Sequence, residues 1–180
     1  MPWLARHGST AWSERGRLQG WAPIGLSAHG IAEAHHLGAW ARTQSISVIR
    51  TSPLRRACET ALIVARYVAA PVHVDRSLCE LNYGQFTGCT LDELAAAAPE
   101  LARVWTAQPW QARFAPHGAL DDIAKALEPL IGQTRTVADS VLCITHGHVI
   151  RAARTLRAEL TAEDFWGTDI PAGSYWPVGD

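Results

Sequence analysis

The sequence predicts an α/β fold, a three-layer α/β/α sandwich with a mostly parallel central sheet between two layers of helices. Two observations predict it: the alternation of strand-like and helix-like segments, and the amphipathic pattern of several of those helical segments. Short apolar, often β-branched runs alternate with longer stretches of helical periodicity, and several of those stretches are amphipathic. The chain has 180 residues, which suits one domain with a sizeable core. We therefore expect a single domain over residues 1–180.

The expected strands are short apolar runs bounded by polar residues, glycine or proline. They cover residues 2–5, 46–49, 72–74 and 140–145. Helical segments separate them, and this alternation favours parallel pairing.

Three helices are expected in the first hundred residues. Ser27 precedes a helix over 28–42, whose apolar residues recur at helical spacing. Residues 54–69 form a strongly amphipathic helix. In the helix over 90–98, Thr90 is the N-cap and Glu93 completes a capping box, and Pro99 ends the helix.

The second half of the chain begins with a stretch whose sequence pattern is less regular. Residues 99–117 contain three prolines and two tryptophans, and we expect a partly helical excursion there. A helix follows from about 119 to 138, with a kink at Pro129. The last predicted helix covers 147–158.

Composition excludes several classes of function. The formal net charge is −1, so there is no global electrostatic case for binding nucleic acid or an acidic membrane. No signal peptide is visible, and no segment approaches the ~20 apolar residues that cross a bilayer, so we expect a cytoplasmic protein. The four cysteines form no CxxC pair and no zinc spacing, so we expect free thiols.

Polar residues follow three of the predicted strands. Arg6-His7-Gly8 follows the first, Thr51-Ser52 the second, and Thr145-His146-Gly147 the last. In parallel α/β sheets, ligands bind outside the carboxyl ends of the strands. We therefore expect these three loops to lie at the same edge of the sheet and to form a site there.

These residue types suit a phosphoryl group. Arginine binds phosphate oxygens through its planar fork, and either Arg55 or Arg56 could join Arg6 in this role. Helix N-termini after Gly8 and Gly147 would add backbone N–H donors. A neutral imidazole can attack phosphorus and form a phosphohistidine. A carboxylic acid such as Glu80 could then protonate the leaving oxygen.

Four segments together resemble a known family. RHGSTAWSERGRLQGW (6–21) resembles the signature of the histidine phosphatase superfamily, also called the phosphoglycerate mutase-like family. Three further segments are similar to later motifs of the family and occur in the same order: TSPLRRACETA (51–61), LCELNYGQFTG (78–88) and ITHGHVIRA (144–152). The resemblance implies the phosphoglycerate mutase-like form of the sandwich.

The resemblance also implies roles. His7 would be the phosphorylated nucleophile, and Glu80 the general acid and then the base for water. The phosphoryl clamp would comprise Arg6, Arg56 and His146, with Arg56 chosen over Arg55 because it directly precedes the motif's alanine. No cofactor or metal is implied.

Other motif residues are expected to bind phosphate or substrate. These are Thr10, Ser13, Gln19, Gly20, Tyr83 and Gly147. Thr10 and Ser13 are also natural N-caps, so a purely structural role stays open for both. Ser13 replaces the family's usual asparagine, and residues 116–120 replace its Pro-Gly-Gly-Glu-Ser stretch without the glutamate.

Two further features have alternative interpretations. His146 and His148 form an HxH pair that could bind a metal, but no carboxylate or third histidine lies nearby in sequence, which disfavours a metal site. The tryptophans are expected to pack in the core or in loops. Alternatively, Trp21, Trp105 and Trp110 could form the wall of an apolar substrate pocket.

The predicted function is a metal-independent phosphatase, of the histidine acid phosphatase type, that acts on a small phosphorylated metabolite. One alternative is phosphoglycerate mutase-type transfer, but the short stretch between Glu80 and His146 leaves little chain for the lid that a mutase needs. The other is an inactive phosphate-binding module. The expected partner is the small phosphorylated substrate, with a phosphoprotein substrate and a homodimer left open.

Overall fold

The structure is a computed structural model that describes residues 3–133, 140–157 and 163–177, without the side chains of 131–133 and 163. Its sheet has five strands in the order β3-β2-β4-β1-β5. The strands are β1 (Trp3–Arg6), β2 (Val48–Thr51), β3 (Val72–Val74), β4 (Val141–Thr145) and β5 (Tyr175–Pro177). The first four pair in parallel, and β5 runs antiparallel to β1. The prediction of a mostly parallel sheet is confirmed.

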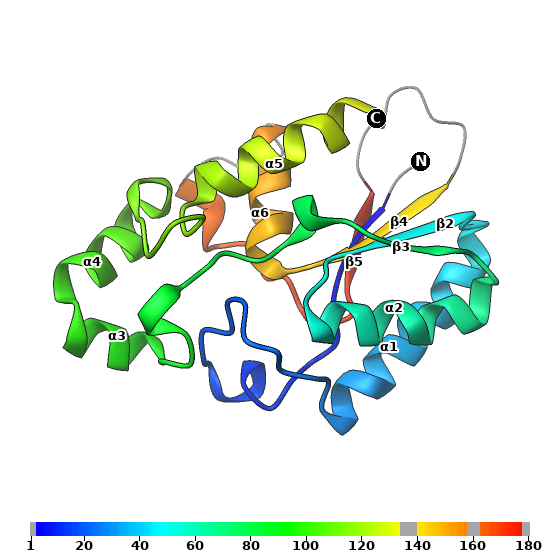
Figure 1. Ribbon diagram of the computed structural model, residues 1–180, viewed down its shortest axis with the longest axis horizontal. Coiled ribbons are helices and arrows are strands. Elements are labelled where there is room, and N and C mark those ends of the chain that lie inside the picture. The colour runs from blue at the N-terminus through cyan, green and yellow to red at the C-terminus, as the bar shows by residue number, and fades with distance from the viewer. Residues whose placement is uncertain (1–2, 134–139, 158–162, 178–180) are drawn as a thin grey trace.

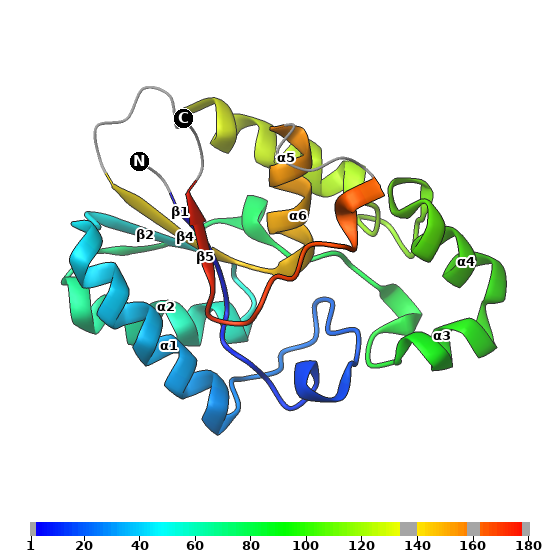
Figure 2. The same ribbon diagram turned by 180° about the vertical axis from the view of Figure 1, so that it is seen from behind.

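Six α-helices accompany the sheet within the described residues. They are α1 (Ala28–Ala41), α2 (Arg55–Val68), α3 (Leu91–Ala97), α4 (Pro99–Ala107), α5 (Leu120–Gln133) and α6 (Gly147–Leu156). Helices α1 and α2 cover one face of the sheet, and α5 and α6 cover the other (Figures 1 and 2). This confirms the three-layer sandwich. In the part of the chain described, no helix has the length and apolar character needed to cross a bilayer.

Side chains that alternate along the strands contribute to two hydrophobic cores, one on each face of the sheet. Leu4 of β1 and Cys143 of β4 pack on the α5/α6 side, whereas their neighbours Ala5, Leu142 and Ile144 pack on the α1/α2 side. Successive side chains of a strand point to opposite faces, so a sheet covered on both sides needs apolar residues at every position.

Most helix boundaries agree with the sequence patterns. Ser27 caps α1 by accepting a hydrogen bond from the Gly30 N–H, and Thr90 and Glu93 form the predicted capping box of α3. Pro99 does more than end α3, because it is also the first residue of α4. Pro129 lies inside α5, and the kink there stays a prediction. The predicted helix ends at 138 and 158 lie outside the described residues.

One strand prediction needs correction, and one strand was not predicted. The strand expected over 46–49 lies at Val48–Thr51, because Ile46 is buried in the α1/α2 core before pairing begins and Ser47 donates its N–H to the Ser140 carbonyl. The edge strand β5 was not predicted at all. It has three residues and ends at Pro177, too short a pattern to stand out from a loop.

A glycine pair lets α1 approach the loop after β1. A Cβ atom on Gly30 would lie 1.9 Å from the Ser9 carbonyl oxygen, and one on Gly8 would lie 2.2 Å from the Gly30 carbonyl oxygen. Ser9 is held there by Glu33 of α1, whose Oε2 accepts the Ser9 N–H at 2.6 Å. The loop that begins at His7 therefore rests directly on the helix.

We expect Gly30→Ala to lower the free energy of unfolding by about 2–3 kcal/mol, even though alanine is the better helix former. The clash is with backbone, so no side-chain rotation can relieve it. Urea denaturation measures the change. Gly167→Ala is the control, because its Cβ would meet nothing nearer than 3.7 Å, and we expect its stability to stay within about 0.5 kcal/mol of wild type. A Gly30→Ala protein as stable as wild type would contradict this close packing.

Candidate active site

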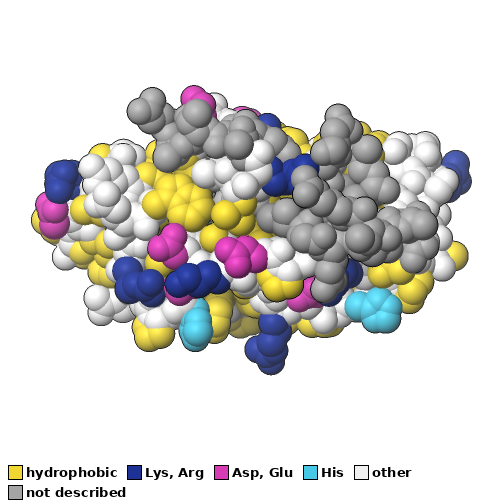
Figure 3. Space-filling model, turned by 90° about the horizontal axis from the view of Figure 1, so that it is seen from above, with side chains coloured by type: hydrophobic (Ala, Val, Ile, Leu, Met, Phe, Trp, Pro, Cys, Tyr) yellow, Lys and Arg dark blue, Asp and Glu magenta, His cyan; other side chains and the backbone are white. Residues whose placement is uncertain are grey.

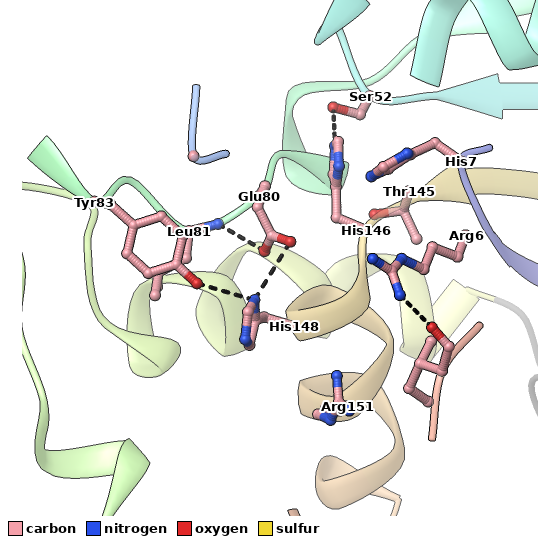
Figure 4. Close-up of polar contacts among 12 residues, drawn as sticks. Arg6, His7, Ser52, Glu80, Leu81, Tyr83, Thr145, His146, His148 and Arg151 are labelled. Atoms are coloured by element: carbon pink, nitrogen blue, oxygen red, sulfur yellow. Dashed lines mark hydrogen bonds and ion pairs between the residues drawn. The ribbon is translucent and has the colours of Figure 1, made fainter. Parts of the chain in front are cut away.

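The carboxyl ends of β1, β2 and β4 meet at one edge of the sheet, as the strand pattern predicts. The His7 and His146 rings lie with their centroids 5.0 Å apart. From the end of β2, the Ser52 Oγ lies 2.8 Å from the His146 Nε2. Figure 4 shows His7, His146 and Arg6 grouped around this point, with Glu80 facing them. The three predicted loops therefore form one cluster.

His7 is held as a neutral imidazole by a contact at each of its two ring nitrogens. Its Nδ1 lies 2.7 Å from the Gly8 carbonyl oxygen, an acceptor, so we assign the ring proton to Nδ1. Nε2 then carries the lone pair and accepts a hydrogen bond from the Arg56 Nε at 3.1 Å. Burial, with the charges of Arg56 and Arg6, lowers the pKa of His7 well below its ordinary value. The ring is therefore neutral at physiological pH.

The two adjacent arginines at the start of α2 face different ways. Arg56 is fully buried, and besides contacting His7 it donates to the carbonyl oxygens of Gly20 at 2.9 Å and Ala22 at 3.4 Å. Burial lowers the pKa of Arg56 to about 10, which still leaves the side chain charged at neutral pH. Arg55 is exposed and pairs with Glu59 at 2.7 Å on the helix surface. Only Arg56 lies within the cluster.

Two buried polar atoms of the cluster have no protein partner. The Arg6 side chain donates through Nη1 to the Ile170 carbonyl, but its Nε is unpaired. His146 contacts Ser52 through Nε2 and leaves Nδ1 unpaired. Buried polar atoms are rarely left unpaired, because each costs about 1–3 kcal/mol. An anion with several acceptor oxygens would satisfy such donors.

Glu80 faces the histidines from the segment after β3. The Leu81 N–H donates to its Oε1 at 2.9 Å, and the His148 Nδ1 lies 3.4 Å from its Oε2. The indole of Trp21 holds the Glu80 backbone by donating to its carbonyl oxygen at 2.6 Å. Burial by itself raises the pKa of Glu80, but His148, His146 and the Leu81 N–H together lower it below its ordinary value. The side chain is thus a carboxylate in these surroundings.

A cavity of about 180 Å³ opens beside these groups. This is several times the roughly 30 Å³ that a water molecule occupies in the liquid, so a phosphoryl group and a small attached fragment fit. Most of the polar residues in its wall are basic. They are Arg6, His7, Arg17, His148 and Arg151, with Glu80 as the acidic one.

The six residues predicted to bind phosphate or substrate lie around this cavity in two groups. Four of them form part of its wall: Ser13, Gln19, Tyr83 and Gly147. Thr10 is fully buried behind them and donates its N–H to the Ser13 Oγ and its hydroxyl to the Gln19 Oε1, both at 2.8 Å. Gly20 presents its carbonyl oxygen to Arg56. Substrate contact by these six residues stays a prediction.

The helix expected directly after Gly8 is absent. The Gly8 N–H donates to the Thr60 Oγ1 at 3.1 Å, and the chain continues as a loop, with a short 3₁₀ helix at Ser13–Arg15, until α1 begins at Ala28. The reason is the glycine contact with Gly30, which fixes the loop against α1. The expectation at Gly147 is confirmed, because α6 begins there.

Of the three tryptophans considered for the pocket wall, two pack in or against the core and one is partly exposed. Trp105 is buried in the α5/α6 core, where it packs edge-on against Tyr83 and Phe114. Trp110 packs against the same core, with its ring 6.2 Å from that of Phe165. Core packing, the first of the two interpretations, therefore holds for both. Trp21 is partly exposed and stacks on His117 beside a second cavity of about 200 Å³.

Sequence reasoning assigned no phosphate- or substrate-binding role to three basic residues of the cavity wall, Arg17, His148 and Arg151. The fold supplies the carboxylate that the HxH pair lacked nearby in sequence, since Glu80 lies 3.4 Å from His148. No group of three potential metal-binding side chains occurs among the residues the structure covers. Arg151 is anchored by hydrogen bonds of 2.8 Å to the Phe165 and Thr168 carbonyls. For His148 and Arg151, the sequence signal that could have found them is helical spacing, because both lie within the first turns of α6.

The buried histidines make stability depend on pH. Burial lowers the pKa of both His7 and His146 below the ordinary value of about 6.5, whereas both titrate normally in the unfolded chain. The unfolded state therefore takes up protons first as the pH falls. Stability is fully present above about pH 6.5 and is lost below it, by up to about 1.4 kcal/mol per pH unit for each histidine.

We expect the free energy of unfolding, measured in urea, to fall by about 2 kcal/mol for this pair between about pH 7 and pH 5.5. The double variant His7→Asn/His146→Asn should lose that part of the dependence. Stability that stays level or rises on acidification would contradict the neutral state of the two rings.

Comparisons with known proteins agree with this geometry. A family model described as the histidine phosphatase superfamily (branch 1) matches residues 3–178. The chain is 32% identical to a glucosyl-3-phosphoglycerate phosphatase of Mycolicibacterium vanbaalenii, over 83% of this chain and 70% of that protein. It is 39% identical to a bifunctional protein of Mycobacterium tuberculosis over 57% of this chain, but this match covers only 28% of that longer protein.

A solved structure extends the likeness to three dimensions. It is a mycobacterial glucosyl-3-phosphoglycerate phosphatase in complex with VO3, and it superposes with a TM-score of 0.83 at 25% identity. The match covers 96% of this chain and 89% of that one. The two chains therefore share the whole sandwich.

Proposed function

The chain belongs to the histidine phosphatase superfamily, and from this premise we propose that it hydrolyses a phosphomonoester of a small metabolite through a phosphohistidine on His7. The observation that carries the proposal is the state of His7, a buried neutral ring whose Nε2 lone pair faces Arg56. A neutral imidazole held among fixed cations is suited to attack a phosphoryl group.

In the first step, the His7 Nε2 forms a bond to phosphorus as the ester P–O bond breaks. Arg6, Arg56 and His146 surround the place where the phosphoryl oxygens would gather charge, and the unpaired Arg6 Nε and His146 Nδ1 are free to donate to them. Glu80 gives a proton to the leaving oxygen. The Arg56 Nε has to release the His7 Nε2 and turn to the phosphoryl oxygens as substrate binds.

In the second step, water attacks the phosphohistidine. Glu80, now a carboxylate, takes a proton from that water, and the N–P bond breaks to return neutral His7 and inorganic phosphate. The arginines and His146 supply the positive charge that this chemistry needs. We therefore propose that the reaction requires no metal ion.

The small cavity supports a metabolite as substrate. On the face seen from above, acidic and basic side chains of the described residues lie interspersed with hydrophobic ones (Figure 3). This mixed surface suits a free small molecule better than a polyanion. The proposal includes a single catalytic domain, and a cytoplasmic location supported by four free cysteines.

Hydrolysis of p-nitrophenyl phosphate tests the proposal. We expect turnover between about pH 5 and pH 8, with a rate that EDTA changes by less than about twofold. Activity that EDTA abolishes and a divalent ion restores would contradict metal independence. A folded protein that hydrolyses nothing would favour the phosphate-binding module, and phosphoryl transfer to added phosphoglycerate would favour the mutase.

A further inference from the structure

His148 lies beside Glu80, and it has no assigned part in the chemistry so far. The inference drawn from His148 rests on the proposed function. It lies in the first turn of α6, and its Nδ1 is 3.4 Å from the Glu80 Oε2 (Figure 4). The Tyr83 hydroxyl lies 3.3 Å from the same nitrogen. One ring nitrogen therefore faces both the carboxylate and a phenol.

Aromatic neighbours fix the His148 ring in this position. The Phe165 ring stacks on it at 6.4 Å with an interplanar angle of 20°, and Trp105 lies 5.2 Å away. Trp166 approaches edge-on at 5.9 Å. A histidine whose ring is held on several sides keeps its Nδ1 directed at Glu80 while still bordering the cavity.

The charged and titratable groups around the same cavity come from four parts of the chain. They are Arg6 from the end of β1 and His7 directly after it, Arg17 from the following loop, Glu80 and Tyr83 from the segment after β3, and Arg151 from α6. Glu80 is the negative one among them. Burial raises the pKa of Tyr83 well above its ordinary value, so its hydroxyl stays protonated. Glu80 is thus the natural partner for a proton on His148.

The proposed reaction raises a difficulty that this contact resolves. Glu80 must deliver a proton to the leaving oxygen, yet its surroundings hold it as a carboxylate. A carboxylate can act as the acid when a neighbouring group stores the proton and passes it on. His148 is the titratable group in direct contact with its Oε2.

We propose that His148 is a positioning residue that stores the catalytic proton and passes it through Glu80. As the ester P–O bond breaks, the proton on the His148 Nδ1 moves to the Glu80 Oε2 and Glu80 passes a proton to the leaving oxygen, so that Glu80 ends the step as a carboxylate. His148 is then neutral. When water attacks the phosphohistidine, Glu80 accepts a proton from that water and returns it to Nδ1. One proton cycles between the two residues, and no further reactant is needed.

His148→Asn tests this proposal, because the asparagine amide can still donate a hydrogen bond to Glu80 but cannot give up its proton. Two matched substrates report on proton delivery. Phenol, like the tyrosine hydroxyl, has a pKa near 10 and needs a proton as it leaves, whereas p-nitrophenol is a much stronger acid and needs it less. We expect kcat/KM to fall about 30- to 100-fold for phenyl phosphate and less than about threefold for p-nitrophenyl phosphate.

His35→Asn is the matched control. His35 makes the comparable histidine–tyrosine contact elsewhere in the fold, at 2.9 Å from the Tyr67 hydroxyl. We expect it to leave both substrates unchanged. His148→Gln is a second test variant in case the loss of the ring disturbs the aromatic neighbours, and near-UV circular dichroism reports on their packing.

Equal losses on the two substrates would show a merely structural role and overturn the proposal, as would no loss on either. The proposed function is tested separately, because His148→Asn should still form the His7 phosphoenzyme from p-nitrophenyl phosphate. If the wild-type protein forms no phosphoenzyme, the proposed function fails and this inference fails with it.

Discussion

Replacing His7 with alanine is expected to lower kcat for p-nitrophenyl phosphate by about four orders of magnitude or more, the scale typical of a lost nucleophile. The variant removes the neutral, buried Nε2 that accepts a hydrogen bond from the Arg56 Nε. Water could then attack only directly, without the covalent intermediate. Initial-rate kinetics at high enzyme concentration measure the loss.

Two controls make the result for His7 specific. His73→Ala removes an exposed histidine from β3, away from the cluster, and should change kcat by less than about twofold. Thermal unfolding of His7→Ala should show a cooperative transition, so that lost activity is not lost structure. A His7→Ala protein within about tenfold of the wild-type rate would place the nucleophile elsewhere.

Replacing Arg56 with lysine should lower kcat/KM by about a hundredfold to a thousandfold, although the charge is kept. The guanidinium contacts His7 and two backbone carbonyls at once, and an ammonium group cannot reproduce this fork. The carbonyls of Gly20 and Ala22 would each lose a donor, so we also expect about 1–3 kcal/mol lower stability.

Arg55→Lys is the matched variant, because it makes the same substitution one residue earlier on the exposed face of α2. Its kcat/KM should stay within about twofold of wild type. Steady-state kinetics of the two variants measure the loss of kcat/KM, and urea denaturation measures the loss of stability. Equal effects of the two substitutions would contradict the assignment of Arg56 to the site.

Much of the fold could be predicted from the sequence because local pattern and tertiary structure agree there. The apolar runs at β1 and β4 predict strands, although β1 has only four residues. The rule that ligands bind at the carboxyl ends of parallel strands then places His7 and His146 together. The capping box at Thr90 is a purely local signal, and it was also visible in the sequence.

Other features depend on contacts between distant segments, which no local pattern contains. The loop after Gly8 is fixed by its approach to Gly30, so the helix expected there does not form. The three residues of β5 pair only because the edge of β1 is available to them. His148 meets Glu80 because α6 packs beside the segment after β3. In the sequence, the spacing of His148 from His146 suggested only a metal-binding pair.

The first measurement should be a rapid acid-free quench of the wild-type protein during turnover of p-nitrophenyl phosphate, followed by peptide mapping. The proposed mechanism requires an acid-labile, base-stable phosphate on the peptide that contains His7, and no label in His7→Ala. Phosphate on another peptide, or turnover with no covalent phosphate on the wild-type protein at any time point, would contradict a phosphohistidine on His7.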